Sequence, residues 1–294
     1  MNCAFELCRE SLIEMKEVRM FLSAVIQLRS TMDVEANWLV LEEQVLRASK
    51  AGAQLIVTPE NSLFLGPQFH KVEQAEELSG ELATRLGELA AKANAYLLIG
   101  SIAEKVISPD GSVDLSKCYN TSLLFSKSGE LLASYRKIHL FDVDVDGGLC
   151  IRESDTIKPG EELVVVETDL GRIGMSICYD LRFPEMYRKL VDRGAEIIVV
   201  PSAFTLTTGK DHWHPLLRAR AIETQTWVLA PGQWGTHDVQ GKRKSYGHSV
   251  IIDPWGVVRA DCGEGIGIGY SEIDLDYMST VRASIPVAQH RRVF

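Results

Sequence analysis

The feature that most constrains the fold is a series of short apolar runs, separated by segments whose apolar residues recur with helical spacing. The runs have the length of strands and occupy residues 21–28, 54–58, 96–102, 173–177 and 196–200. A strand that is apolar on both faces is typical of a sheet covered by another layer on each side. The sequence therefore predicts an α/β fold built from layers of strands and helices.

Helices are predicted where apolar residues recur every three or four positions. These segments are residues 34–50, the stretch from Leu82 to Leu89, residues 184–193, and residues from about 211 to 222. Strand pairs joined by tight turns are expected at residues 119–135 and 249–260. Residues 142–160 are predicted to form a long polar loop, and the tail from Arg282 to Phe294 has no clear period.

A single domain is expected to span most of the chain. Its 294 residues suffice for one large core, and no low-complexity linker divides them. We assign this domain to residues 20–294. Residues 1–19 are interpreted as an N-terminal extension of uncertain role, since Met20 directly precedes the first strand and is an alternative start.

Charge and hydropathy argue against several classes of partner. Nucleic acids and anionic membrane surfaces are bound by clustered Lys and Arg, whereas this chain has a net charge of −9. No apolar run reaches the roughly 18 residues of a membrane span, and the first residues lack the pattern of a secretory signal. We therefore expect a cytoplasmic protein without nucleic-acid or membrane partners.

The cysteines and histidines form no recognisable metal-binding pattern. The six cysteines include no C-x-x-C pair and no Cys/His zinc spacing, so we interpret them as reduced thiols. His212 and His214 offer two imidazoles but lack a third ligand at a suitable spacing. The sequence thus predicts no metal site and no cofactor.

One cysteine lies where a nucleophile is expected. Cys178 follows the apolar run 173–177 and precedes Phe183-Pro184-Glu185, which has the form of a first helical turn with Pro184 at its start. A strand-to-helix turn points one side chain toward the positive end of a helix. Such a position lowers a thiol pKa from its free value of about 8.5, so we expect a reactive Cys178.

Two other reactive residues also follow strand-like runs. Glu60 comes after the run 54–58, and Lys137 comes after residues 130–136. Because sites in α/β sheets gather beyond the carboxyl ends of strands, these residues and Cys178 are candidates for one pocket. A thiol, a carboxylate and an ammonium supply the nucleophile, the proton carrier and the positive charge that amide cleavage requires.

Three segments of the sequence carry a resemblance to a known family. They are Thr58-Pro59-Glu60-Asn61, Tyr135-Arg136-Lys137-Ile138-His139-Leu140-Phe141 and Ile177-Cys178-Tyr179-Asp180-Leu181-Arg182-Phe183-Pro184-Glu185. In this order they resemble the signature segments of the nitrilase (carbon-nitrogen hydrolase) superfamily, most closely the branch of omega-amidases and deaminated glutathione amidases. The resemblance implies a four-layer αββα sandwich and a homodimer or larger homo-oligomer.

The same resemblance implies roles for individual residues. Glu60, Lys137 and Cys178 match the catalytic triad, and Glu153 matches a second glutamate that supports the site. The Tyr179 backbone N–H is expected to bind the oxyanion together with Lys137. Further substrate-binding candidates are Arg182, which is expected to bind a substrate carboxylate through its planar fork, and, more weakly, His139 and Thr205.

The implied reaction is hydrolysis of a non-peptide amide through a thioester on Cys178, without metal or cofactor. The preferred substrate is deaminated glutathione, a small amide carrying a carboxylate, which would give α-ketoglutarate and Cys-Gly. The alternatives within the superfamily are an omega-amidase acting on α-ketoglutaramate, an N-carbamoyl amidohydrolase and a nitrilase. A catalytically silent binding subunit is the alternative from a different class.

Overall fold

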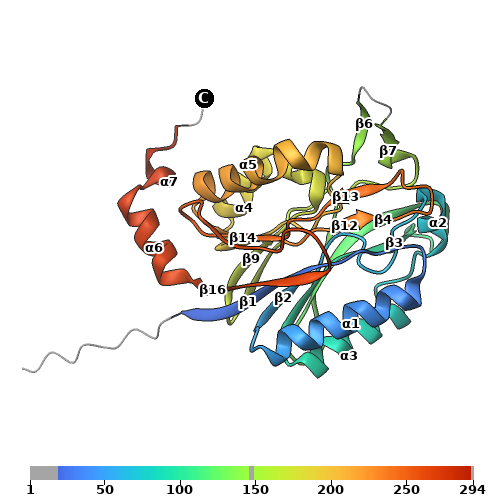
Figure 1. The fold of residues 1–294 in the computed structure, drawn as a ribbon, viewed down its shortest axis with the longest axis horizontal. Coiled ribbons are helices and arrows are strands. Elements are labelled where there is room, and N and C mark those ends of the chain that lie inside the picture. The colour runs from blue at the N-terminus through green and yellow to red at the C-terminus, as the bar shows by residue number, and fades with distance from the viewer. Residues whose placement is uncertain (1–18, 146–148, 293–294) are drawn as a thin grey trace, which may run out of the picture.

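Two six-stranded sheets pack against each other in the computed structural model, which describes residues 19–145 and 149–292 (Figure 1). In spatial order the first sheet contains β16 (Gly267–Asp274), β1 (Met20–Gln27), β2 (Leu55–Val57), β3 (Tyr96–Ile107), β4 (Val113–Phe125) and β5 (Leu131–Arg136). The second contains β15 (Val258–Asp261), β14 (Val250–Ile252), β11 (Trp227–Ala230), β10 (Ile197–Val199), β9 (Gly171–Met175) and β8 (Val165–Thr168).

The two sheets repeat one pattern of strand directions. In each, three neighbouring strands run parallel, namely β1, β2 and β3 in the first and β9, β10 and β11 in the second. Antiparallel strands flank each parallel set, with one on one side and two on the other. The carboxyl ends of the parallel strands therefore form an edge on each sheet at which loop residues can meet.

Helices cover the outer face of each sheet, which gives the four-layer αββα sandwich expected from the sequence (Figure 1). The first sheet is covered by α1 (Val34–Lys50) and α3 (Glu81–Ala93), and the second by α4 (Pro184–Asp192) and α5 (Leu206–Thr224). The remaining helices are α2 (Gln68–Glu73), α6 (Leu275–Ser284) and α7 (Val287–His290). Two short antiparallel pairs lie outside the large sheets. One is β6 (Asp142–Val145) with β7 (Leu149–Arg152), and the other is β12 (Trp234–Thr236) with β13 (Lys244–Tyr246).

Alternation along the strands fills both faces of the first sheet. Leu97 and Ile99 of β3 pack in the cluster beneath α1 and α3, whereas Leu98 between them packs in the core shared with the second sheet. In β4 the same division separates Leu123 from Leu124. Because successive strand residues point to opposite faces, an unbroken apolar run is what a sheet buried on both sides requires.

Two predictions about secondary structure were wrong, and the tail, for which the sequence predicted no element, is partly helical. Residues 142–160 are not a simple polar loop, because β6 and β7 form a hairpin there and a 3-10 turn follows at Glu153–Asp155. Helix α5 begins at Leu206 rather than near Asp211, since Thr205 caps it by accepting a hydrogen bond from the Thr208 N–H. Part of the tail is also helical, through the end of α6 and α7.

The remaining structural predictions concern the chain's ends and the membrane. Residues 1–18 of the expected N-terminal extension lie outside the described residues. Among the residues that the structure does describe, no helix is both long and apolar enough to span a bilayer.

Candidate active site

Four buried ionisable side chains meet between the two sheets. Glu60 follows β2, Lys137 follows β5, Glu153 begins the 3-10 turn after β7, and Cys178 begins the 3-10 turn after β9. All four are nearly inaccessible, with exposed fractions of 3% for Glu60, 2% for Lys137, 7% for Glu153 and 8% for Cys178. The structure thus brings together the four residues that the sequence predicted for catalysis.

Glu60 lies at the centre of this cluster. Its Oε1 accepts hydrogen bonds from Lys137 Nζ at 3.0 Å and from Asn120 Nδ2 at 2.8 Å. Its Oε2 accepts one from the Ala203 backbone N–H at 2.8 Å, and the carboxylate lies near enough to the Cys178 thiol to raise the pKa of that thiol. The carboxylate is therefore held in one orientation beside the thiol, as a proton carrier must be.

The bend that carries Glu60 passes directly over β3, and it depends on Gly100. A Cβ atom at Gly100 would overlap the Thr58 carbonyl oxygen and the Pro59 backbone. Only a residue without a side chain allows the two backbones to approach so closely. Gly100 therefore contributes to the position of Glu60.

Glu153 binds the other side of the Lys137 ammonium. Its two carboxylate oxygens lie 3.0 and 2.8 Å from Lys137 Nζ, and its Oε2 also accepts the Phe141 backbone N–H at 2.7 Å. One buried cation is thus paired with two carboxylates. Such a pair is stable only when hydrogen bonds satisfy the remaining oxygens, and Asn120, Ala203 and Phe141 provide them here.

Cys178 occupies a sharp turn between β9 and α4. Its φ of +48° lies in the left-handed region, which is uncommon for a residue other than glycine and is found preferentially at functional sites. Its backbone N–H donates to the Pro201 carbonyl at 2.9 Å, which ties the turn to the end of β10. The strand-to-helix turn predicted from the sequence is confirmed.

Asp180 holds this turn against the segment that carries Lys137. Its fully buried carboxylate accepts hydrogen bonds from the Ile177 N–H at 2.8 Å and the Tyr135 hydroxyl at 2.7 Å. It also accepts the His139 backbone N–H at 3.0 Å and contacts His139 Nδ1 at 2.7 Å. Sequence analysis gave Asp180 no role, although an acidic residue in the first turn of a helix is a capping signal.

The electrostatics of the cluster favour a charged Lys137 and Glu60. Burial acts to lower the Lys137 pKa, but Glu153 and Glu60 outweigh it and raise that pKa well above its ordinary value. Burial acts to raise the Glu60 pKa, yet Lys137, Lys71 and the Ala203 N–H bring it below its ordinary value. An ammonium and a carboxylate are therefore both present at neutral pH.

The expected lowering of the Cys178 pKa is wrong. Burial, and then the negative charge of Glu60, raise the pKa of the Cys178 thiol well above its ordinary value, and the attraction of Lys137 does not offset them. The sulfur in the resting site is therefore a neutral thiol. It becomes nucleophilic only as its proton moves to a neighbouring base.

Arg182 is a cation at the end of the 3-10 turn that Cys178 begins. Its Nη2 lies 3.3 Å from His212 Nδ1, and its guanidinium carbon lies 5.8 Å from the centre of the Tyr179 ring and 5.4 Å from that of Phe204. Within residues 19–145 and 149–292, Arg182 forms no ion pair with a carboxylate. Its charge is thus available to an anionic ligand.

The other predicted substrate-binding residues have structural contacts of their own. Tyr179 packs edge-on against Phe141 and Phe183, with ring centres 5.0 and 5.4 Å away. His139 stacks on Phe183 at 3.7 Å and is held by Asp180. Thr205 caps α5. A role for these three residues in binding substrate stays a prediction.

Two buried polar residues near the cluster were missed by sequence analysis. Asn120, on β4, donates to Glu60 and, at 3.4 Å, to Glu153. Lys71, on α2, donates to Asn61 Oδ1 at 2.6 Å, and its charge acts on Glu60. Lys71 and Asn61 also line a cavity of about 250 Å³ that Cys178 does not line. Asn120 begins Asn120-Thr121-Ser122, which has the form of a glycosylation acceptor and indicates no catalytic role, and Lys71 stands in no motif, so the sequence alone offered no signal for a role in the site.

The chain is similar to known proteins in both sequence and fold. The sequence pattern of the carbon-nitrogen hydrolase family matches residues 22–283. A protein of Synechocystis sp. (strain PCC 6803 / GT-S) named deaminated glutathione amidase is 41% identical over 273 residues, which are 92% of this chain and 98% of the relative.

Solved structures give the same assignment. The structure of the Caenorhabditis elegans NitFhit protein has a TM-score of 0.84 and 40% identity to this chain. The match covers 93% of this chain and 65% of the NitFhit chain. A mutant amidase from Nesterenkonia sp. AN1 has a TM-score of 0.73 and 26% identity, and the match covers 90% of this chain and 95% of that one. That structure shows the acetamide moiety of fluoroacetamide added covalently at the active site cysteine. The chain therefore belongs to the carbon-nitrogen hydrolase family and is an enzyme of that family.

Proposed function

We propose that this protein is an amidase that hydrolyses deaminated glutathione to α-ketoglutarate and Cys-Gly, with Cys178 as the nucleophile. The observation that carries the proposal is the buried cluster in which Glu60 binds the Lys137 ammonium and both groups act on the Cys178 thiol. The substrate assignment is supported by the Synechocystis relative, which is named deaminated glutathione amidase. The covalent addition at the cysteine of the Nesterenkonia amidase supports the role of Cys178.

In the first half of the reaction, Glu60 accepts the proton of the Cys178 thiol while the sulfur attacks the amide carbonyl. This order follows from the charges of the resting site, where the thiol is neutral and Glu60 is ionised. The carbonyl oxygen becomes an oxyanion, which Lys137 and the Tyr179 backbone N–H stabilise. Tyr179 suits this role because it lies in the first turn of a helix, where backbone N–H groups lack partners within the helix.

The second half releases both products. Glu60 returns its proton to the nitrogen of the departing Cys-Gly, which leaves an α-ketoglutaryl thioester on Cys178. Glu60 then takes a proton from water as the water oxygen attacks the thioester carbonyl. The C–S bond breaks, the departing sulfur takes that proton back from Glu60, and α-ketoglutarate leaves. Lys137 stays protonated throughout, since Glu60 and Glu153 hold its pKa well above the ordinary value.

Arg182 is proposed to bind the carboxylate of the substrate. The guanidinium lies four residues from the nucleophile and is only partly buried. The phenyl ring of Phe204 and the phenol ring of Tyr179 flank it, which restricts its orientation without neutralising its charge. A planar, charged fork of this kind is suited to a carboxylate.

The second candidate is an omega-amidase acting on α-ketoglutaramate. This substrate has the same keto-acid part as deaminated glutathione and differs only in its leaving group, ammonia instead of Cys-Gly. The cluster and Arg182 serve both substrates equally. The names of the relatives favour deaminated glutathione.

The decisive experiment compares both substrates with the purified protein and with two cysteine variants. We expect release of Cys-Gly from deaminated glutathione to exceed release of ammonia from α-ketoglutaramate at equal concentrations. Cys178→Ala should abolish both activities and the thioester adduct in a mass spectrum. Cys150→Ala, which changes an exposed thiol, should retain the wild-type rate.

Each part of the proposal can fail separately. Turnover by Cys178→Ala at the wild-type rate would show that another residue is the nucleophile. Cleavage of α-ketoglutaramate alone would keep the mechanism and refute the substrate. The cytoplasmic location and the homo-oligomer expected from the sequence remain predictions, which fractionation and light scattering can check.

A further inference from the structure

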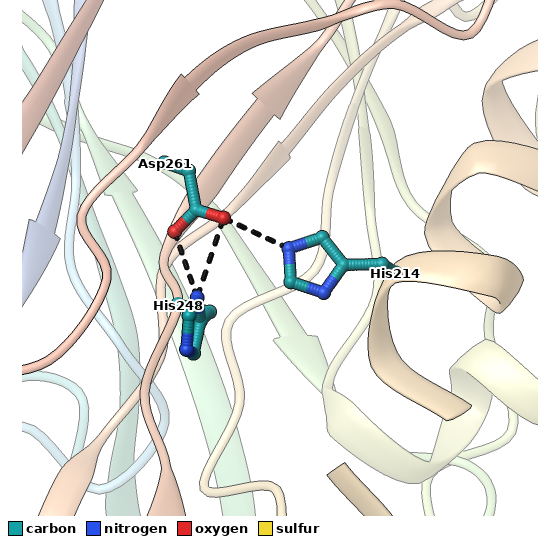
Figure 2. Close-up of side chains that lie close together, drawn as sticks. All are labelled: His214, His248 and Asp261. Atoms are coloured by element: carbon teal, nitrogen blue, oxygen red, sulfur yellow. Dashed lines mark hydrogen bonds and ion pairs between the residues drawn. The ribbon is translucent and has the colours of Figure 1, made fainter. Parts of the chain in front are cut away.

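Three ionisable side chains that the catalytic cluster does not use come together near the surface of the second sheet (Figure 2). His214 Nε2 lies 2.9 Å from Asp261 Oδ2. His248 Nδ1 lies 3.0 Å from Oδ1 and 3.3 Å from Oδ2 of the same carboxylate. Two imidazole nitrogens and a carboxylate therefore face a common point.

The three residues come from three separate parts of the chain. His214 lies on α5, His248 lies between β13 and β14, and Asp261 ends β15. Residues so far apart in sequence converge only because the helix packs against the end of the sheet. Sequence analysis considered His214 together with His212, but His212 instead approaches Arg182.

Asp261 and His248 have further contacts outside the cluster. The Gly263 N–H donates to Asp261 Oδ1 at 2.8 Å. The His248 ring stacks on Tyr246 with ring centres 4.5 Å apart, and its carbonyl accepts the Trp213 indole N–H at 2.7 Å. Supporting contacts of this kind orient metal ligands in known sites.

The distances suit a small metal ion. Bonds of about 2.0–2.2 Å from Zn²⁺ to nitrogen and oxygen place neighbouring ligands of a tetrahedral site roughly 3.3–3.5 Å apart. Here the ligand atoms all lie within 4.8 Å of one another, and the pairs to Asp261 are at 2.9 to 3.3 Å.

The ligand types also select the class of metal. Imidazole nitrogens favour zinc and its neighbours among the transition metals, whereas Mg²⁺ and Ca²⁺ require mainly oxygen ligands. Among the described residues, Asp261 forms ion pairs with the two histidines and with no Lys or Arg. No fixed ammonium or guanidinium thus competes for the carboxylate.

We propose that His214, His248 and Asp261 form a site for one divalent transition metal ion of the zinc type, separate from the catalytic cluster. Both histidines bind as neutral imidazoles through the ring nitrogen that faces Asp261, with a proton on the other ring nitrogen. Three protein ligands leave a fourth position for water. The side chains are 26% to 33% exposed, which allows the ion to enter from solvent.

The test measures metal binding directly, because Zn²⁺ also binds thiols and would affect activity at Cys178. Full-length Cys178→Ala protein is treated with chelator, freed of it, and titrated with Zn²⁺ in a calorimeter. We expect one tight site per chain. In the same background, His248→Ala and Asp261→Asn should each weaken binding more than about 100-fold, since loss of even an indirect partner costs about 10- to 100-fold.

The matched control is His70→Ala, which removes an exposed histidine paired with a carboxylate of Glu73 elsewhere on the surface. This variant should bind Zn²⁺ as the parent does. A second readout is the melting temperature, which Zn²⁺ should raise in the parent and in His70→Ala but not in Asp261→Asn. Equal Zn²⁺ affinity in the parent and in both site variants, or no binding by the parent, would overturn the proposal and leave a hydrogen-bonded His–Asp cluster only.

Discussion

The catalytic cluster and the His214–His248–Asp261 cluster contain similar chemical groups in opposite surroundings. The side chains of Glu60 and Lys137 are 4% and 2% exposed, whereas that of Asp261 is 33% exposed. In the buried cluster every charge has several protein partners, drawn from β4 and from the segments after β2, β5, β7 and β10. At the surface cluster, water completes the solvation of each group.

The difference in burial determines how much stability each cluster loses when one charged partner is removed. A charge withdrawn from water depends on its partners, so losing one of them leaves an uncompensated charge. A charge in contact with water loses little when its partner is removed. The buried cluster can therefore hold proton-transfer groups in fixed states, while the surface cluster remains free to exchange a ligand with solvent.

The largest effect on stability is expected from Lys137→Met. The change leaves Glu60 and Glu153 facing each other without the ammonium that lies 3.0 and 2.8 Å from them. Breaking a buried pair in this way costs about 3–5 kcal/mol. Urea denaturation should show that loss in the free energy of unfolding. A loss below about 1 kcal/mol would mean that the buried cluster behaves like an exposed one.

A smaller effect is expected from Asp180→Asn, which tests how the buried cluster is positioned. The asparagine retains its size, but its amide can accept fewer of the hydrogen bonds from Ile177, Tyr135 and His139. Hydrogen bonds to a charged group contribute about 1.5–3 kcal/mol, so we expect a loss of that order. If Asp180 positions the turn, kcat should also fall by about 100-fold with little change in KM.

The control for this variant is Asp253→Asn, which also changes a fully buried carboxylate in the second sheet. Asp253 binds Arg259 and the turn before β15. The Asp253→Asn variant should lose stability to a similar extent as Asp180→Asn while keeping the wild-type kcat. Equal loss of kcat in the two variants would reduce the role of Asp180 to general stability.

Sequence analysis succeeded where the chemistry is local to one segment. The strands around Leu97 and Ile197, helix α1 and the Cys178 turn were all predicted, because periodicity and turn residues are properties of neighbouring positions. It missed β6 and β7, although the alternation of Asp142-Val143-Asp144-Val145 is typical of a strand. The acidic residues and the nearby glycines of this segment are equally typical of a polar loop, so the alternation over four residues does not by itself identify a strand.

Interactions across the sheets could not be predicted in this way. Asn120 lies 60 residues from Glu60, and Asp180 lies 45 residues from Tyr135. The error for the Cys178 pKa has the same origin. A turn at a helix start lowers a thiol pKa, but burial between two sheets and the approach of Glu60 raise it, and both arise from tertiary structure.

The dependence of stability on pH should also distinguish the clusters. The Glu60 pKa lies below its ordinary value of 4.5 despite the opposing effect of burial, because Lys137, Lys71 and the Ala203 N–H favour the carboxylate. Its contribution to stability is therefore present above pH 4.5 and is lost as the pH falls through the folded-state pKa. The raised Lys137 pKa keeps that group charged over the same range.

We thus expect the free energy of unfolding to decrease when the pH is lowered below 4.5. This decrease should be smaller than the loss caused by Lys137→Met at neutral pH, because Lys137 stays paired with Glu153. Glu60→Gln should reduce this acid dependence. Asp261→Asn should reduce it less, because solvent screens the exposed carboxylate. Identical acid profiles for the wild type and Glu60→Gln would refute the assignment of this dependence to Glu60.

The smallest effect is expected from His214→Ala in buffer free of metal. The change removes one hydrogen bond to a carboxylate that keeps its contacts with His248 and Gly263 and with water. Exposed pairs of this kind contribute about 0–1 kcal/mol, so the free energy of unfolding should change by less than about 1 kcal/mol. Urea denaturation of His214→Ala beside Lys137→Met measures the contrast directly. A loss of about 3 kcal/mol or more for His214→Ala would place the surface cluster among the buried, mutually dependent charges, and the contrast between the two regions would fail.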